Sequence, residues 1–344
     1  MSPPPRRAVT VTLAVMLGTA VLVAIAAGSV ALPPFAVFAS LLAHAGVGAA
    51  EATASALGPS GEAILWSVRL PRVLLAALVG GGLAVVGTAL QSVFRNPMAD
   101  SGLLGVGSGA ALGAVLAVRL GLSTDVFFAL PLAAFAGALA AVLAVYLIAH
   151  ASRRPSLQGL LLTGLAVAAL AGAGTSMLLV ATEEFRVKTV LFWLAGGLEG
   201  RGWTHVQAAA LFVLTGCAAL LLMARPLDVL SLGEDEAASL GLPVRGTRLT
   251  ILCLSSLVAG AATAVAGSVP FVGLVAPHAL RPLVGPLGRH LLPAAFLGGA
   301  LLVVLADLVA RTFSARLELP LGSVTAFVGA PYFLIALRAN EGRT

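Results

Sequence analysis

Residues 73–90 read VLLAALVGGGLAVVGTAL, eighteen residues without a charged side chain in the stretch between Arg72 and Arg95. A helix needs about 20 mainly apolar residues to cross the hydrocarbon core of a bilayer. Extended to its polar borders, this run predicts a transmembrane helix over 64–94. Its glycines are typical of membrane helices that pack closely, since lipid tails give helices no hydrophobic reason to associate.

The composition of the whole chain points the same way. Of its 344 residues, 59% are hydrophobic and only 10% are charged, and the mean hydropathy is +1.05. A soluble domain carries about a quarter charged residues, so this chain could not cover a water-facing surface. In lipid, helices satisfy their own backbone hydrogen bonds. The sequence therefore predicts an all-α polytopic membrane protein, with residues 1–344 forming one transmembrane domain.

Apolar runs between charged borders predict about ten membrane segments. Their approximate ranges are 8–31, 64–94, 102–118, 127–149, 157–181, 204–224, 248–267, 271–280, 291–312 and 322–338. The first is longer than the 7–15 residue core of a cleavable signal peptide, so we expect it to be a retained span. The segment 271–280 contains Pro277 and is too short to cross alone.

Basic residues in short loops set the orientation of membrane proteins. Twelve of the 20 lysines and arginines fall on the inner side if the N-terminus is inside, which predicts N-in and C-in. Residues 32–62 then form an external connection, and residues 225–248 form the longest internal segment. The basic residues lie at the ends of apolar runs, so the net charge of +6 reflects topology and predicts no nucleic-acid partner. The scattered histidines and two cysteines predict no metal site.

The internal segment 225–248 has features of a short capped helix. Ser231 with Glu234 three residues later has the form of a capping box, and Gly241 is placed to end the helix. We expect such an acidic helix to dock on a cytoplasmic protein. The phosphate-binding loop of ATPases needs a lysine after glycine, whereas the only lysine, Lys188, follows Val187. The chain is therefore expected not to be an enzyme, and ATP would be hydrolysed by another subunit.

Charged residues also lie inside or beside the predicted spans. Asp307 and Arg311 are one helical turn apart, which predicts an intramembrane ion pair. Together with Arg311, Arg69 and Arg72 would form an exposed cationic rim that docks an acidic protein, or they would reach toward lipid headgroups. A proton relay through Asp307 is the alternative, which would make the chain a proton-coupled secondary transporter.

Several motifs resemble those of one known family, the FecCD-type permeases of importers for ferric siderophores, haem and cobalamin. They span about residues 60–338 and are RLPR at 69–72, RNPMAD at 95–100, SLGE at 231–234, FVGLVAPH at 271–278, ADLVAR at 306–311, ELPLG at 318–322 and GAP at 329–331. The resemblance implies the type II ABC importer permease fold, a homodimer in the inner membrane, and transport by alternating access. Permeases for ferric siderophores, haem and cobalamin share these motifs. Because iron-chelate systems are numerous in the family, we expect an iron chelate, a ferric siderophore or haem, as substrate, with cobalamin as the alternative.

The same resemblance implies partners and site residues. Two copies of a cytoplasmic ATP-binding subunit, which holds ATP and magnesium, would dock below, and a periplasmic or lipid-anchored binding protein would dock above on Arg69, Arg72 and Arg311. The implied ATPase-coupling residues are Asp228, Ser231, Leu232, Gly233, Glu234, Asp235, Glu236 and Gly241. The implied cytoplasmic gate residues are Asn96, Met98, Leu157 and Gln158, of which the last two replace small hydroxyl residues.

Overall fold

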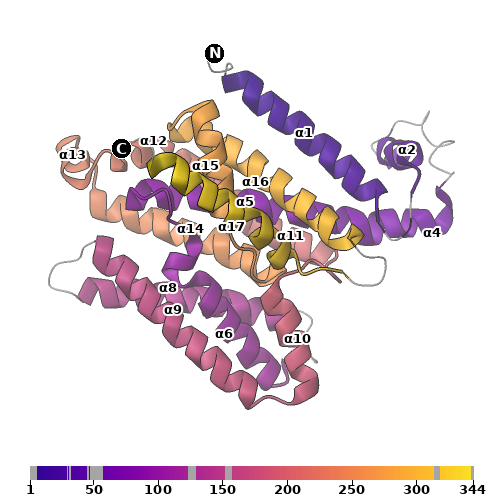
Figure 1. The fold of residues 1–344 in the computed structure, drawn as a ribbon, viewed down its shortest axis with the longest axis horizontal. Coiled ribbons are helices and arrows are strands. Elements are labelled where there is room, and N and C mark those ends of the chain that lie inside the picture. The colour runs from indigo at the N-terminus through magenta and orange to yellow at the C-terminus, as the bar shows by residue number, and fades with distance from the viewer. Residues whose placement is uncertain are drawn as a thin grey trace.

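The protein is a bundle of helices (Figure 1). The computed structural model describes residues 6–28, 30, 32–44, 46, 57–122, 129–151, 157–313 and 318–341, and all regular elements in these ranges are helical. The predicted external connection at 32–62 therefore lies partly outside the described residues. Within the described part of it, two short helices were not predicted, α2 (Pro34–His44) and α4 (Gly58–Ala63).

Seven helices are long and apolar enough to cross a membrane. They are α1 (Arg6–Ala26), the continuous unit of α4, the π-helix η3 (Ile64–Arg69) and α5 (Leu70–Phe94), α8 (Ala129–Ala151), α9 (Leu157–Val180), α11 (Trp203–Leu222), α14 (Val244–Ala266) and α16 (Gly288–Thr312). The shorter apolar helices α6 (Val106–Arg119), α15 (Val272–Val284) and α17 (Leu321–Glu341) match the remaining three predicted segments. The helix α10 (Glu184–Ala195) follows α9 and was not predicted.

Helix α5 is the centre of the bundle. It packs against α11, α14, α15 and α16, and most of its residues are buried. Two of its glycines allow this. A Cβ atom added at Gly80 would collide with the carbonyl oxygen of Gly299 in α16, and one at Gly87 would collide with the carbonyl oxygen of Gly273 in α15. Backbone therefore meets backbone, as expected for packing through small residues.

A second group of helices, α6, α8, α9 and α10, lies beside this core (Figure 1). Gly105, Gly109 and Gly113 are spaced four residues apart in the sequence, which predicts a packing stripe on one face of a helix. The structure shows such a stripe on α6 at two of them, because Cβ atoms at Gly109 and Gly113 would collide with the backbone of α8. Gly105, the third residue expected in the stripe, instead has φ 72° and joins the 3-10 helix η4 (Ser101–Leu104) to α6.

Both termini lie at the end of the bundle that carries the short helices α12 (Ala224–Leu230) and α13 (Glu234–Ser239). In Figure 1 the last turns of α17 point toward the same end of the bundle as α12 and α13. Arg6 lies against Gly285, in the turn before α16, and α12 holds the start of α16 through Asp228 and Gly288. We call this the α13 end. Leu321 at the start of α17 and Gly196 after α10 meet at the opposite end through a backbone hydrogen bond. This placement agrees with the predicted N-in, C-in orientation.

The close approach of α5 and α15 gives the first prediction. Gly87→Ala should destabilise the protein by about 1–3 kcal/mol, because the methyl group overpacks the contact with Gly273. A lower melting temperature of the detergent-solubilised protein would measure it.

Gly18→Ala is the matched control. It makes the same change inside helix α1, where a Cβ atom meets nothing within 4 Å. Both substitutions raise helix propensity equally, so equal melting temperatures for the two variants would contradict the packing role of Gly87.

Candidate functional site

The internal segment forms two short helices rather than the single capped helix that the sequence predicts. The capping box is wrong: the hydroxyl of Ser231 donates to the carbonyl oxygen of Asp228, 2.6 Å away, at the end of α12. Gly233 precedes Glu234 with φ 143°, a conformation that suits glycine, and it separates the two helices. Gly241 has φ 81° just after α13, where the sequence places a helix-ending glycine.

Helix α13 presents an acidic surface with apolar edges. Glu234, Asp235 and Glu236 are exposed in its first turn, where the positive end of the helix favours carboxylates. Leu232 is 60% exposed and Leu240 is 66% exposed. We name these five residues the coupling surface.

Buried contacts hold the coupling surface in place from below. Ala237 is buried among apolar residues that include Val93 at the end of α5 and Ile251 in α14. Arg248 forms an ion pair with Glu234. Asp228, which the resemblance assigns to ATPase coupling, accepts a hydrogen bond from the backbone nitrogen of Gly288, 2.6 Å away, and so anchors the start of α16.

The predicted gate residues Asn96 and Met98 lie in a tight turn after α5. The Asn96 side-chain oxygen accepts a hydrogen bond from the backbone nitrogen of Met98, 2.9 Å away. Met98 lines a small cavity together with residues of α15 and α17, among them His278 and Tyr332, whose rings meet edge to face. The turn therefore packs against α15 and α17, each of which contains an internal proline.

The second predicted pair of gate residues is less well supported. Leu157 begins α9, and its side chain lies outside the described residues. Gln158 is exposed and does not line the cavity that Met98 lines. In this conformation the structure therefore brings α15 and α17, and not α9, to the cavity beside Met98.

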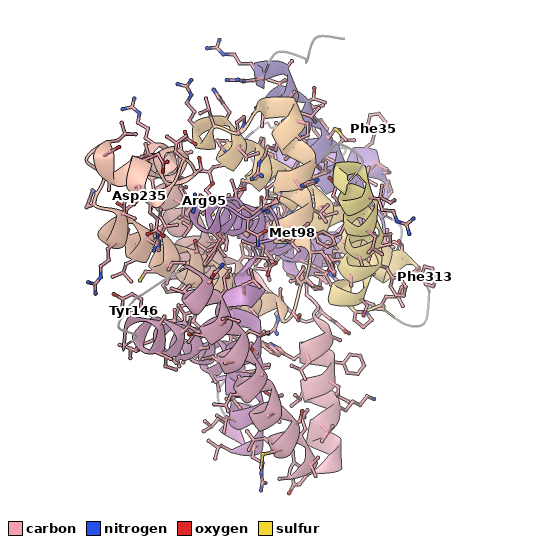
Figure 2. The ribbon with its side chains drawn as sticks, turned by 60° about the vertical axis from the view of Figure 1, so that its left-hand side comes forward. Phe35, Arg95, Met98, Tyr146, Asp235 and Phe313 are labelled. Atoms are coloured by element: carbon pink, nitrogen blue, oxygen red, sulfur yellow. The ribbon has the colours of Figure 1, made fainter. Side chains whose placement is uncertain are left out.

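Arg95 is a residue that the sequence alone marks only as a topology determinant. It ends α5 in the left-handed region, with φ 48°, directly before Asn96. A Cβ atom at Gly233 would lie 3.5 Å from its Nη1 atom. Figure 2 shows Arg95 between Asp235 and Met98. Arg95 thus lies between Gly233, which precedes α13, and the turn at Asn96 and Met98, and its signal in the sequence is that it is the first residue of the RNPM motif.

A cluster of charges lies at the opposite end. The Arg72 guanidinium holds Asp307 by bonds of 2.9 Å and 3.2 Å from Nε and a contact of 2.9 Å from Nη2. It also contacts Glu318, at 2.9 Å. The predicted pair of Asp307 with Arg311 is present, but the contact is longer, at 3.5 Å. Arg72 is therefore the main partner of Asp307.

The prediction of an exposed cationic rim is wrong in this conformation. Arg69 is 5% exposed and Arg311 is 8% exposed. Arg69 donates to the carbonyl oxygens of Ile25 and Ala26, each at 2.8 Å, and Arg311 donates to that of Ala24. These carbonyls end α1, where the helix dipole favours a positive charge. The two arginines therefore fasten α1 to α5 and α16.

The same contacts argue against a proton relay through Asp307. Its carboxylate is engaged by two arginines, by Arg72 at 2.9 Å and by Arg311 at 3.5 Å, which is the arrangement of a structural ion pair between α5 and α16.

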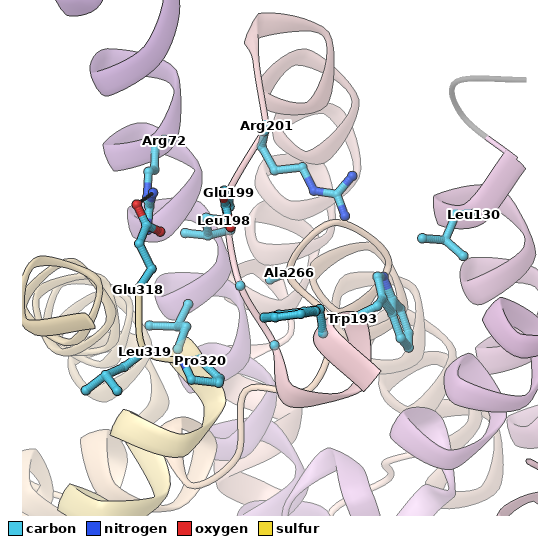
Figure 3. Close-up of a pocket in the computed structure, with 15 residues that line it drawn as sticks. Arg72, Leu130, Trp193, Leu198, Glu199, Arg201, Ala266, Glu318, Leu319 and Pro320 are labelled. Atoms are coloured by element: carbon cyan, nitrogen blue, oxygen red, sulfur yellow. Dashed lines mark hydrogen bonds and ion pairs between the residues drawn. The ribbon is translucent and has the colours of Figure 1, made fainter. Parts of the chain in front are cut away.

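A cavity of about 420 Å³ opens beside this cluster (Figure 3). It is lined by Arg72 and Glu318, by Trp193 at the end of α10, and by Glu199 and Arg201 of the connection before α11. Glycines build its wall: a Cβ atom at Gly196 would collide with the backbone of Ser268. This cavity was not predicted. The sequence feature that could have indicated it is the glycine-rich stretch 196–202.

An all-helical bundle with long apolar helices, an exposed acidic helix at one end and a charge-lined cavity at the other is the architecture of a multi-pass membrane protein. The chain belongs to the FecCD transport family, whose model matches residues 15–339. It is thus a permease subunit of an ABC importer, as predicted.

The similar proteins transport different compounds. The chain is 45% identical over 282 residues to the cobalamin import system permease protein BtuC of Halobacterium salinarum, covering 82% of this chain and 75% of that protein. It is 42% identical over 285 residues to the hemin transport system permease protein HmuU of Yersinia pestis, covering 81% and 85%. A solved structure of a metal-chelate type ABC transporter, described as inward-facing, matches with a TM-score of 0.84 at 29% identity, covering 97% and 99%.

The buried charge cluster gives the second prediction. Arg72→Gln should destabilise the protein by about 3–5 kcal/mol, because it leaves Asp307 with only the longer contact to Arg311. The double variant Arg72→Gln with Asp307→Asn should recover most of the loss, since it removes the under-compensated charge. Melting temperatures would measure both.

Arg119→Gln, which removes an exposed arginine at the end of α6, is the control and should change little. A double variant no more stable than Arg72→Gln alone would show that Arg72 acts by packing, and not by compensating Asp307.

Proposed function

We propose that this permease imports a metal chelate across the inner (plasma) membrane with the help of three kinds of partner. These are a second copy of itself, a cytoplasmic ATP-binding subunit and an external binding protein that delivers the substrate. The observation that carries the proposal is the pairing of a coupling surface at one end with a gate turn one residue beyond Arg95. ATP and magnesium belong to the partner subunit.

The coupling surface is the proposed contact with the ATP-binding subunit. Its three carboxylates would attract and orient a basic groove of the partner. Leu232 and Leu240 would provide apolar surface that becomes buried when the two proteins bind. Because Ala237 is buried, α13 is held against the rest of the bundle and would pass a displacement on to it. Movement of α13 would act on Arg95 and so on Asn96 and Met98.

Exposed apolar side chains on α9 and α17 support the proposed homodimer. Leu162 and Leu165 project from α9, and Phe327, Leu334 and Ile335 project from α17. An apolar face on the described part of each helix could meet lipid or a second copy. The second copy is favoured because α17 also lines the cavity at Met98, so a pair of α17 helices would place two gates beside one path.

The proposed substrate is a metal ion enclosed in an organic chelate. Relatives named for cobalamin, hemin and Fe(3+)-citrate all fall within 37–45% identity, and each of these compounds belongs to that class. An iron chelate is our first candidate. Cobalamin is the second, supported by the relative from Halobacterium salinarum.

Reconstitution tests the function and gives the third prediction. Proteoliposomes with the ATP-binding subunit and the binding protein should take up a radiolabelled ferric chelate or cobalamin only when ATP is present on the subunit's side. Uptake driven by a proton gradient without ATP would overturn the importer assignment. Competition between the two labelled substrates would identify the preferred one.

The coupling surface should be needed for this activity. Glu234→Lys with Glu236→Lys should weaken association with the ATP-binding subunit about tenfold, and uptake should fall with it. Arg248→Gln is the control, because it breaks the internal pair with Glu234 without reversing charge on the surface. Normal association of the double variant would refute the proposed coupling surface.

The external binding protein is proposed to dock near Arg72, the least buried arginine of the predicted three. Glu318 is 41% exposed and bonds Arg72 from outside, so an acidic residue of the partner could replace it. The fifth prediction is that Glu318→Gln tightens docking about threefold, more at low salt. Glu199→Gln, a nearby exposed acid, is the control. Unchanged affinity in titrations with Glu318→Gln would exclude Arg72 as the contact.

A further inference from the structure

Helices α1 and α16 form a parallel pair at the edge of the bundle, where α1 packs beside α16 (Figure 1). Arg6 at the start of α1 lies against Gly285, just before α16 begins. Arg311, near the end of α16, donates to the carbonyl oxygen of Ala24, near the end of α1. The two helices therefore start at the same level, at the α13 end of the molecule.

Basic side chains meet where these two helices start. The Nη2 atom of Arg6 lies 3.3 Å from where a Cβ atom of Gly285 would be, and Arg289 follows in the first turn of α16. Arg6 and Arg289 both lie close enough to His290 for their charges to act on its ring. Both arginines are exposed, and neither forms an ion pair within the described residues. We name Arg6, Arg289 and His290 the basic cluster.

The acid beside the basic cluster does not neutralise it. The charge of Asp228 in α12 also acts on His290, but its Oδ1 atom accepts the hydrogen bond from the backbone nitrogen of Gly288. One carboxylate beside two arginines leaves an excess of positive charge. The transport mechanism proposed above does not use this charge.

An exposed apolar face of α1 begins next to the basic cluster. Arg7 is exposed and lies four and eight residues before Val11 and Val15, so that these three residues share one face of the helix. Val11 is 61% exposed and Val15 is 63% exposed. On the other side of the helix, Val9 and Leu13 pack against apolar residues of α15 and α16. An apolar face that is open to lipid thus ends at cations that have no partner in the described part of the chain.

We propose that the basic cluster binds an anionic phospholipid of the inner leaflet, with the phosphate at Arg6 and Arg289 and the acyl chains along Val11 and Val15. Basic sites beside membrane helices on the cytoplasmic side are suited to acidic headgroups. An acidic segment of the ATP-binding subunit would match the arginines but not the apolar face. A neutral lipid would match the apolar face but leave the positive charge uncompensated. The proposed dimer contact uses α9 and α17, so it leaves this face of α1 to the membrane.

The bound lipid would complete the attachment of α1 to the bundle. At the outer end, Arg69 and Arg311 donate to carbonyl groups at the end of α1. At the α13 end, the described packing of α1 on α15 and α16 is apolar. A phosphate shared by Arg6 and Arg289 would join the two helices there. The site depends on the orientation proposed above but not on transport, so it is tested on the permease alone.

The test places a reporter on the exposed face of α1 in the full chain. Cys217→Ala and Cys253→Ala remove the native cysteines, and Val11→Cys carries an environment-sensitive fluorophore. The protein is reconstituted in phosphatidylcholine vesicles, and phosphatidylglycerol or phosphatidylcholine with a spin-label quencher on its acyl chain is added. Phosphatidylglycerol should quench at an about fivefold lower mole fraction for each arginine that its headgroup contacts.

Charge variants test whether the basic cluster causes this preference. Arg6→Gln with Arg289→Gln should remove most of the difference between the two quenchers, whereas Arg6→Lys with Arg289→Lys should retain it. The matched control is Arg119→Gln with Arg338→Gln, which removes two exposed arginines outside the cluster and should also retain the difference. A difference that survives unchanged in the first double variant would overturn the proposal.

A second reporter position controls for bulk lipid. Leu22 is exposed and lies eleven residues after Val11, which places it on the same face of α1 but about 16 Å farther from the basic cluster. Both quenchers should act equally on a label at Leu22→Cys. Equal quenching of the label at Val11→Cys would mean that bulk lipid alone covers the face and would overturn the proposal. Protection of that label from both quenchers would show that protein covers it, which would overturn the proposal as well.

Discussion

The packing of α5 against its neighbours through bare backbone is the constraint on which the structure depends. Gly80 and Gly87 let α16 and α15 approach so closely that any side chain between them would be excluded. The dispersion attraction between these closely packed backbones replaces the hydrophobic drive that lipid cannot supply. Helix α5 is about 37 Å long, and it carries Arg72 at one end and Arg95 at the other. The two functional ends of the molecule are therefore joined by one rigid helix.

The charges at the outer end follow from the same architecture. Once α5 and α16 are in contact, Arg72 and Asp307 face each other in a region poor in water, where an unpaired charge would be costly. Arg69 and Arg311 donate instead to the carbonyl groups at the end of α1, which the helix itself leaves without a donor. The three arginines that the sequence predicts at the surface, Arg69, Arg72 and Arg311, thus hold α1, α5 and α16 together.

The sequence predicts best where a property depends on runs of residues. Long apolar stretches predict the membrane segments to within a few residues, and the RNPM motif marks a turn that the structure shows at 95–98. Prediction fails where the outcome depends on tertiary partners. Arg72 and Asp307 are 235 residues apart, so helix periodicity favours the weaker neighbour Arg311. The capping box predicted at Ser231 does not form, because Gly233, with φ 143°, interrupts the chain between α12 and α13.

In the mechanism proposed above, coupling would follow the short path from α13 to Met98. Ala237 lies in the same apolar cluster as Val93, which belongs to the last turn of α5. A shift of α13 would therefore also displace that turn. Arg95, in a conformation that few residues other than glycine adopt, is the point where a small rotation redirects the chain. The gate turn begins at the next residue, and it packs on α15 and α17, both of which contain proline and lack some backbone hydrogen bonds. In the proposed mechanism, a displacement that begins at the coupling surface would thus reach two helices that prolines interrupt.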